Sequence, residues 1–171
     1  MEAEKEKQAI AQVTRAIHQE IDAIEKRALR LAEGSKQDRS VEDAQFENER
    51  ARLANSPGLS REERATREAD IDRRQLESRQ ARTKADLDRR RAEEDSKVTA
   101  AGRALADAEA AGNPAGVKKA AEEEARVRSA ASAEMIRIKA ELARMEEKNR
   151  LERDTQRERS EASIRSAREA D

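Results

Sequence analysis

The part of the chain that decides the fold lies in residues 8–32, which read QAIAQVTRAIHQEIDAIEKRALRLA. Large aliphatic residues recur here at intervals of seven, starting at Ile10. A seven-residue apolar repeat keeps one narrow stripe of a helix against a partner helix, as in a coiled coil. We therefore expect a helix whose apolar stripe faces another copy or another protein. With the intervening positions included, this N-terminal seam comprises Ile10, Val13, Ile17, Ile21, Ile24 and Leu31.

The composition of the whole chain favours long helices. Of its 171 residues, 44% are charged and 1% are aromatic, and Phe46 is the single aromatic residue. Large aromatic side chains dominate ordinary cores, so their near absence argues against a sandwich, a barrel or an α/β domain. Disorder is the alternative for so polar a chain. A net charge of −1 and abundant helix-forming residues oppose it. We expect an all-α fold, an elongated long-helix hairpin or coiled coil with no compact globular core.

Glycine and proline divide the chain into four expected segments. Residues 1–33 form an N-terminal amphipathic helix that stops at Gly34, because glycine favours helix ends. Residues 34–58 form a connector with a short helix that begins at Val41 after an N-cap at Ser40. Residues 59–112 form a long helix behind a capping box, Ser60 to Glu63. Residues 113–171 form a long helix that returns antiparallel and ends in a charged tail.

The turn between the two long helices is the clearest local signal. Gly112 suits a helix end, Asn113 suits an N-cap, and Pro114 suits a first helical position, where its missing N–H costs nothing. Gly116 closes the motif. Folding the chain about Asn113 would place Leu105 near Ala121, Leu87 near Ile138 and Leu76 near Asn149. The mid-chain seam predicted for these two arms comprises Leu76, Leu87, Val98, Leu105, Met135, Ile138, Leu142 and Met145.

Catalytic and metal-binding patterns are missing from the sequence. The chain has no cysteine, and its lone histidine, His18, follows the seam residue Ile17 on the expected helix. One histidine without cysteine is no nucleus for a metal site. Carboxylate pairs such as Glu62 and Glu63 would lie on solvated faces, whereas acid–base catalysis needs a partly buried cleft. We predict no enzyme, no catalytic residues, no cofactor and no bound metal.

One basic stretch stands out between Arg73 and Arg91. It holds eight basic and three acidic residues, a net charge of +5. Such a patch can bind phosphate or an acidic protein. The stretch has no aromatic residue for base stacking. Neighbouring acids such as Glu141, Glu146 and Glu147 could also neutralise it. The candidate docking patch comprises Arg73, Arg74, Arg82, Arg89, Arg90 and Arg91.

These features together favour a structural or assembly protein that acts as a spacer and docking rod. Its partners would be other copies of itself, as a homo-oligomer, and other proteins of an assembly. The dense use of alanine, arginine and glutamate is similar to that of bacteriophage virion, tail and scaffold proteins. This likeness of composition implies incorporation into a virion or another large assembly. The alternative is a regulatory or DNA-associated adaptor that uses the basic stretch. We expect no membrane span, synthesis in the cytoplasm, and either a whole chain or a piece of a longer rod.

Overall fold

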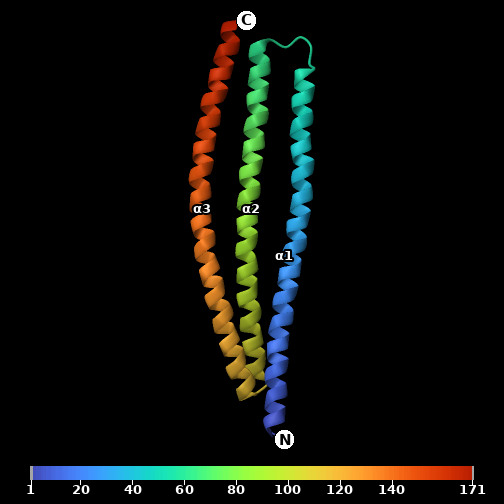
Figure 1. Ribbon diagram of the computed structural model, residues 1–171, viewed down its shortest axis with the longest axis vertical. Helices are drawn as coiled ribbons and strands as arrows, with labels where there is room; N and C mark the ends of the chain where they lie inside the picture. Colours follow the sequence, from blue (N-terminus) through green and yellow to red (C-terminus); the bar gives the residue numbers. More distant parts are fainter. Residues whose placement is uncertain (1, 171) are drawn as a thin grey trace. The chain divides into compact units, whose positions relative to one another are not determined.

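The protein is built from three long helices (Figure 1). The computed structural model describes residues 2–170, except for the side chains of residues 2, 3 and 6. Helix α1 spans Glu2–Ala54, α2 spans Arg61–Ala110 and α3 spans Pro114–Ala170, with lengths of 53, 50 and 57 residues. No strand occurs in this part of the chain. The all-α prediction is confirmed, while the outermost residues of the predicted segments, Met1 and Asp171, lie outside the described range.

The chain forms two compact units, and every helix contributes to both. Unit 1 consists of Met1–Ala32 and Leu87–Ala140. Unit 2 consists of Glu33–Asp86 and Glu141–Asp171. Each unit therefore contains a segment of α1, a segment of α2 and a segment of α3, and each has its own packing.

Helix α1 continues through the predicted connector, so the predicted stop at Gly34 is wrong. The N-cap predicted at Ser40 and the new helix predicted at Val41 are wrong for the same reason, because both residues lie inside α1. Glycine within a helix costs only about 1 kcal/mol relative to alanine, which is too little to break a helix held by tertiary contacts. One such contact follows at once, since Arg39 of α1 forms an ion pair with Asp86 of α2.

The start of α2 follows its sequence signal closely. The backbone N–H of Glu63 donates to the Ser60 hydroxyl at 3.1 Å, and the N–H of Ser60 donates to Glu63 Oε2 at 3.0 Å. These two bonds are the reciprocal pair of a capping box, so that prediction is confirmed. Before the box, Gly58 turns the chain with a φ of 86°, a conformation that favours glycine.

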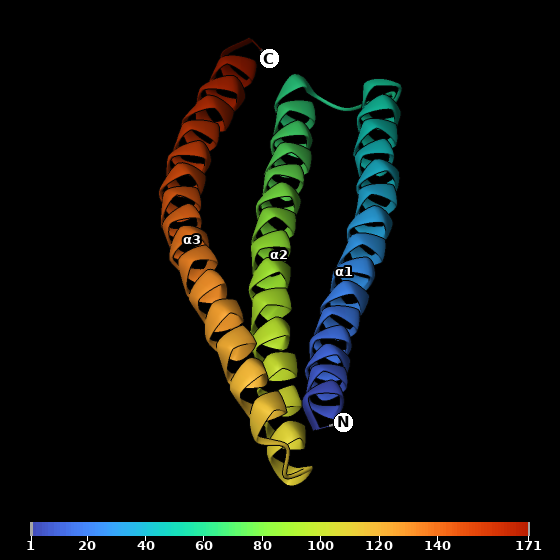
Figure 2. The same cartoon turned by 60° about the horizontal axis from the view of Figure 1, so that its bottom comes forward.

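The turn between α2 and α3 is also confirmed (Figure 2). Gly112 has a φ of 63°, and its N–H donates to the carbonyl of Glu109 at 3.0 Å. Helix α3 begins at Pro114, and the side-chain oxygen of Asn113 accepts from the N–H of Gly116 at 3.1 Å. A Cβ atom at Gly116 would lie 2.6 Å from Nδ2 of Asn113. The cap therefore needs glycine at this position as well as asparagine three residues before it.

Small residues make up most of the core of unit 1. Ile17 and Ile138 are its fully buried large side chains, with exposed fractions of 0% and 1%. Alanine has no side-chain entropy to lose and lets helix backbones approach closely. The unit is thus held by a narrow, close contact. Its other buried apolar residues are Leu87, Ala100, Ala101, Ala108, Ala120 and Ala131.

In unit 2 the core is a single cluster at one end of the helix pair α1 and α2. Phe46 and Leu53 from α1 pack against Ile71 from α2, and Leu59 from the intervening loop packs against them. The one aromatic residue of the chain is therefore part of this cluster. The absence of a thick core, expected from composition, holds in both units.

Most residues of the predicted seams are partly buried within the chain. Ile17, Leu87 and Ile138 are buried. Leu31 is 54% exposed, so the N-terminal seam does not extend to it within unit 1. A straight helix drifts by about 20° per heptad against a seven-residue repeat, which turns Leu31 away from the contact that buries Ile17. The partly buried seam residues are Ile10, Val13, Ile21, Ile24, Leu76, Val98, Leu105, Met135, Leu142 and Met145.

Candidate functional site: a groove between α2 and α3 in unit 2

Helices α2 and α3 lie side by side in unit 2 through contacts near both ends of their paired segments. At one end, Arg168 Nη2 lies 2.5 Å from Glu62 Oε1 and Arg61 Nη1 donates to the carbonyl of Ala170 at 3.4 Å. Toward the other end, the side-chain amide of Gln80 donates to the carbonyl of Asn149 at 3.2 Å. The predicted neighbour of Asn149 was Leu76, four residues before Gln80, so the observed register differs from the expected one by about one helical turn.

The α3 segment of this unit is covered only along one thin line. None of its described residues, from Glu141 to Ala170, is buried. Partial burial recurs every three or four residues, as expected for one side of a helix against one neighbour. A helix in this state has further apolar surface available for contact. The partly buried residues are Leu142, Met145, Asn149, Glu152, Gln156, Ser160, Ile164 and Ala167.

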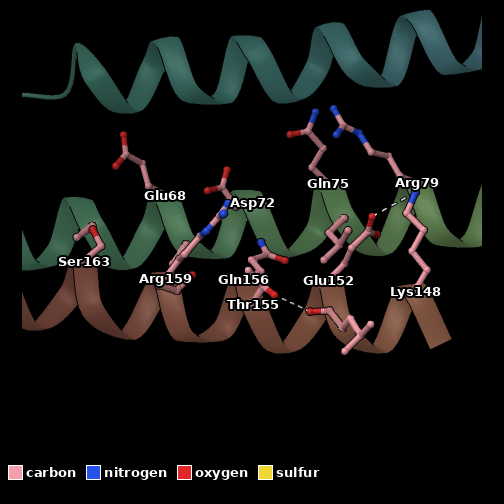
Figure 3. A pocket seen from close by; sticks show the side chains of 15 residues that line it. Glu68, Asp72, Gln75, Arg79, Lys148, Glu152, Thr155, Gln156, Arg159 and Ser163 are labelled. Carbon is pink, nitrogen blue, oxygen red and sulfur yellow. Dashed lines mark hydrogen bonds and ion pairs between the residues drawn. The ribbon is translucent and has the colours of Figure 1, made fainter. Parts of the chain in front are cut away.

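An open groove of about 670 Å³ runs along this line of contact (Figure 3). All of its lining residues belong to α2 or α3. Its apolar lining comes from Ala65, Ala69 and Leu76 of α2 and from Leu151 of α3. Leu151 is 54% exposed, which makes it one of the most exposed large apolar side chains of the molecule. The groove therefore offers apolar surface to an incoming partner.

Charged side chains line the groove in an ordered way. Figure 3 shows Glu68 and Asp72 of α2 at the same end as Arg159 of α3. At the other end, Glu152 lies beside Lys148 of α3, and the side chain of Arg79 of α2 points away from Glu152. Acidic residues of α2 thus lie at the same end of the groove as a basic residue of α3, whereas at the other end α3 carries charges of both signs. Lys148 Nζ lies 3.6 Å from Glu152 Oε1.

A second groove, of about 460 Å³, lies along the same helix pair. It shares Ala69, Leu76, Gln156 and Ser160 with the first groove, so these four residues form the strip between the two. Ile164 adds apolar surface to the second groove. The contact between α2 and α3 in unit 2 is therefore one strip wide, with open space on both sides.

Ion pairs hold α1 against α2 in the same unit. Arg50 Nη2 lies 2.5 Å from Asp72 Oδ1 and donates to the side chain of Gln75 at 2.6 Å. Arg74 Nη2 lies 2.6 Å from Glu49 Oε2, and this hydrogen bond raises the pKa of Arg74 above its usual value. The sequence did not predict these contacts, because the first helix was expected to end at Gly34. A connector was expected in the part of α1 that supplies Glu49 and Arg50.

The arginines of the predicted basic patch are largely neutralised within the chain. In unit 2, Arg73 pairs with Asp70, Arg74 pairs with Glu49, and Arg82 Nη2 lies 2.5 Å from Glu42 Oε2. The acids expected to neutralise the patch were those of the returning helix. In unit 2 the paired acids instead belong to α1 and to α2 itself. A patch whose charges are already paired has less electrostatic attraction left for phosphate.

In unit 1, two of the three remaining arginines of the predicted patch are also engaged. Arg90 pairs with Glu134 of α3, and this hydrogen bond lowers the pKa of Glu134 below its usual value. Arg89 also interacts with neighbouring groups, and Arg91 is exposed. Leu87 lies about one turn from Arg90 on α2, and Ile138 lies about one turn from Glu134 on α3. The Arg90–Glu134 pair therefore agrees with the predicted proximity of Leu87 and Ile138.

A small acidic cluster surrounds Lys97 in unit 1. Its ammonium lies 2.9 Å from Glu93, 3.0 Å from Glu94 and 3.4 Å from Glu25 of α1. Burial would lower the pKa of Lys97, but hydrogen bonds to Glu93 and Glu94 outweigh it and raise the pKa above its usual value. Lys97 is therefore a fixed cation that ties α2 to α1.

The remaining candidate features give no further site. Among residues 2–170, no group of histidine, aspartate and glutamate side chains is arranged to hold a metal ion. Within the same range, no helix has a stretch long and apolar enough to cross a membrane. His18 is exposed on α1. Comparisons of the chain with protein-family models, with curated proteins and with solved structures found no match.

Proposed function

We propose that the protein is a non-enzymatic assembly component that binds other helices, including those of its own copies, and acts as a spacer and docking rod. The observation that carries this proposal is the α3 segment of unit 2, in which no described residue is buried. An open groove runs beside this segment, and its mixed lining includes the apolar side chains of Leu76 and Leu151. Long helices that leave such a face open are suited to contact with further helices.

Exposed aliphatic side chains elsewhere support the same proposal. Leu29, Leu31 and Val41 of α1 and Ile136 of α3 are all more than half exposed. Single exposed apolar residues are common on proteins, but their presence on a chain with so few large apolar residues reduces what remains for its own core. The composition suggests a virion, tail or scaffold as the setting in which such a rod would serve.

The DNA-associated alternative has weaker support. It depends on the basic stretch Arg73–Arg91, and Arg74, Arg82 and Arg90 of that stretch are ion-paired to acids of neighbouring helices. Binding to a phosphate backbone would have to break these pairs or use the few arginines that remain. We therefore favour protein partners.

Mass measurement in solution tests the proposal directly. Light scattering in line with size exclusion, at several protein concentrations, should give a discrete oligomer whose mass is a multiple of 19.2 kDa. Detection should use refractive index, because the chain lacks tryptophan and tyrosine. A monomer at every concentration would overturn the self-assembling rod.

A further inference from the structure

We infer that the groove of unit 2 lined by Glu68, Leu76, Arg79, Leu151, Glu152 and Arg159 is a self-association site that packs on the same groove of a second copy. This inference rests on the proposed assembly function and assigns a surface and an occupant to it. The two copies would be related by a two-fold axis parallel to the helices.

The first argument is charge complementarity. Glu68, Arg79 and Arg159 form no side-chain hydrogen bond or ion pair with any described residue, although many charges of the unit are paired. With the two-fold axis along the helices, α2 of one copy faces α3 of the other at the same level. Glu68 then lies at the level of Arg159 of the second copy. Arg79 lies at the level of Glu152 of the second copy, a carboxylate whose neighbour within its own chain is Lys148. The groove is therefore complementary to itself.

The second argument is the position of the apolar residues. Leu76 and Leu151 line the same groove; Leu76 lies three residues before Arg79 on α2, and Leu151 directly precedes Glu152 on α3. The parallel two-fold arrangement brings both leucines of each copy together at one level, which removes four apolar side chains from water. An antiparallel arrangement would also match the charges, but it would set the leucines against the polar end of the groove. The leucines therefore select the parallel arrangement.

The third argument is the state of α3. In this unit α3 touches one neighbour along one strip, and a second copy would place it between two α2 helices. An isologous contact of this kind uses one patch twice and closes after two copies. It would form a four-helix arrangement in which every helix is antiparallel to both of its neighbours.

The first test compares two exposed aliphatic residues of α3. Leu151→Asp places a charge in the groove, whereas Ile136→Asp is the matched control, because Ile136 is 69% exposed and belongs to unit 1. Sedimentation equilibrium should show that Leu151→Asp weakens association by at least about tenfold, since a buried unpaired charge opposes contact. The control should associate like the wild type, and circular dichroism should show that both variants keep their helix content.

The second test exchanges the groove charges. Arg159→Glu should weaken association, while the control Lys139→Glu should not; neither position has a charged residue three or four places away on α3. Combining Arg159→Glu with Glu68→Arg should restore association. If association of the Glu68→Arg variant is restored by Arg79→Glu and not by Arg159→Glu, the parallel arrangement is wrong.

These outcomes separate the two proposals. If the wild-type protein associates and Leu151→Asp leaves the affinity unchanged, the groove is not the self-association site. The proposed assembly function would still stand. A wild-type protein that is monomeric at all concentrations overturns the assembly function itself.

Discussion

Unit 1 and unit 2 use the same three helices in different ways, and α3 shows the difference best. In unit 1, α3 buries Gly116, Ala120, Glu123, Ala131 and Ile138. In unit 2, none of its described residues is buried. Small residues at the contact allow helices to approach closely, whereas long polar side chains keep them apart. A helix can therefore bury residues against its neighbours over one part of its length and leave every residue at least partly exposed over another.

Aliphatic truncation should give the largest contrast between the units. Ile138→Ala removes a side chain that is 1% exposed in unit 1 and should lower the free energy of unfolding by about 2–5 kcal/mol. Ile164→Ala removes a partly exposed side chain in unit 2 and should cost less than about 1 kcal/mol. Urea unfolding followed by circular dichroism measures both. Equal losses would show that the two α3 segments are packed alike.

Helix capping should give an intermediate effect that is the same in both units. Asn113→Ala in unit 1 and Ser60→Ala in unit 2 each remove a side-chain acceptor from the start of a helix. Each should lower the free energy of unfolding by about 1 kcal/mol, because capping is a local interaction. The same urea titration applies. A much larger loss for one cap would mean that its turn also supports tertiary packing.

The smallest effect concerns pH and the Arg90–Glu134 pair of unit 1. The pKa of Glu134 is lowered in the folded state. This carboxylate therefore stabilises the fold at pH values above 4.5, the ordinary pKa of glutamate. That contribution is lost as the pH falls through the lowered pKa. Glu134→Gln should therefore be less stable than the wild type near pH 7, and the difference should shrink as the pH falls below 4.5 and through the lowered pKa. A difference that stays constant with pH would show that the pair is not responsible.

Local signals explain which parts of the fold could be predicted. The starts of α2 and α3 follow from Ser60, Glu63, Asn113 and Pro114, because capping depends only on residues a few positions apart. Gly34 misled the prediction, since its small helix penalty is outweighed by contacts between α1 and α2 that are distant in sequence.

The groove could be predicted only in part. The sequence marked Leu76 as a seam residue, but it gave no reason to single out Leu151, Glu68 or Arg159. Their proximity depends on the register between α2 and α3 and on which side of each helix the contact lies. A shift of one residue in that register would rotate a different set of side chains into the groove. Periodicity finds apolar stripes, whereas surface complementarity needs coordinates.

The tight connection at Ala111–Asn113 has a consequence for the order in which the chain folds. Contacts next to this turn close loops of a few residues, whereas the contact between Glu62 and Arg168 joins residues 106 positions apart. Because closing a loop costs more entropy as it lengthens, pairing of α2 with α3 is favoured to start at the turn and proceed outward. Each newly formed turn of helix shortens the loop that the next contact must close. The last contacts to form should then be those of Glu62 and Arg61, and they should also be the first to open.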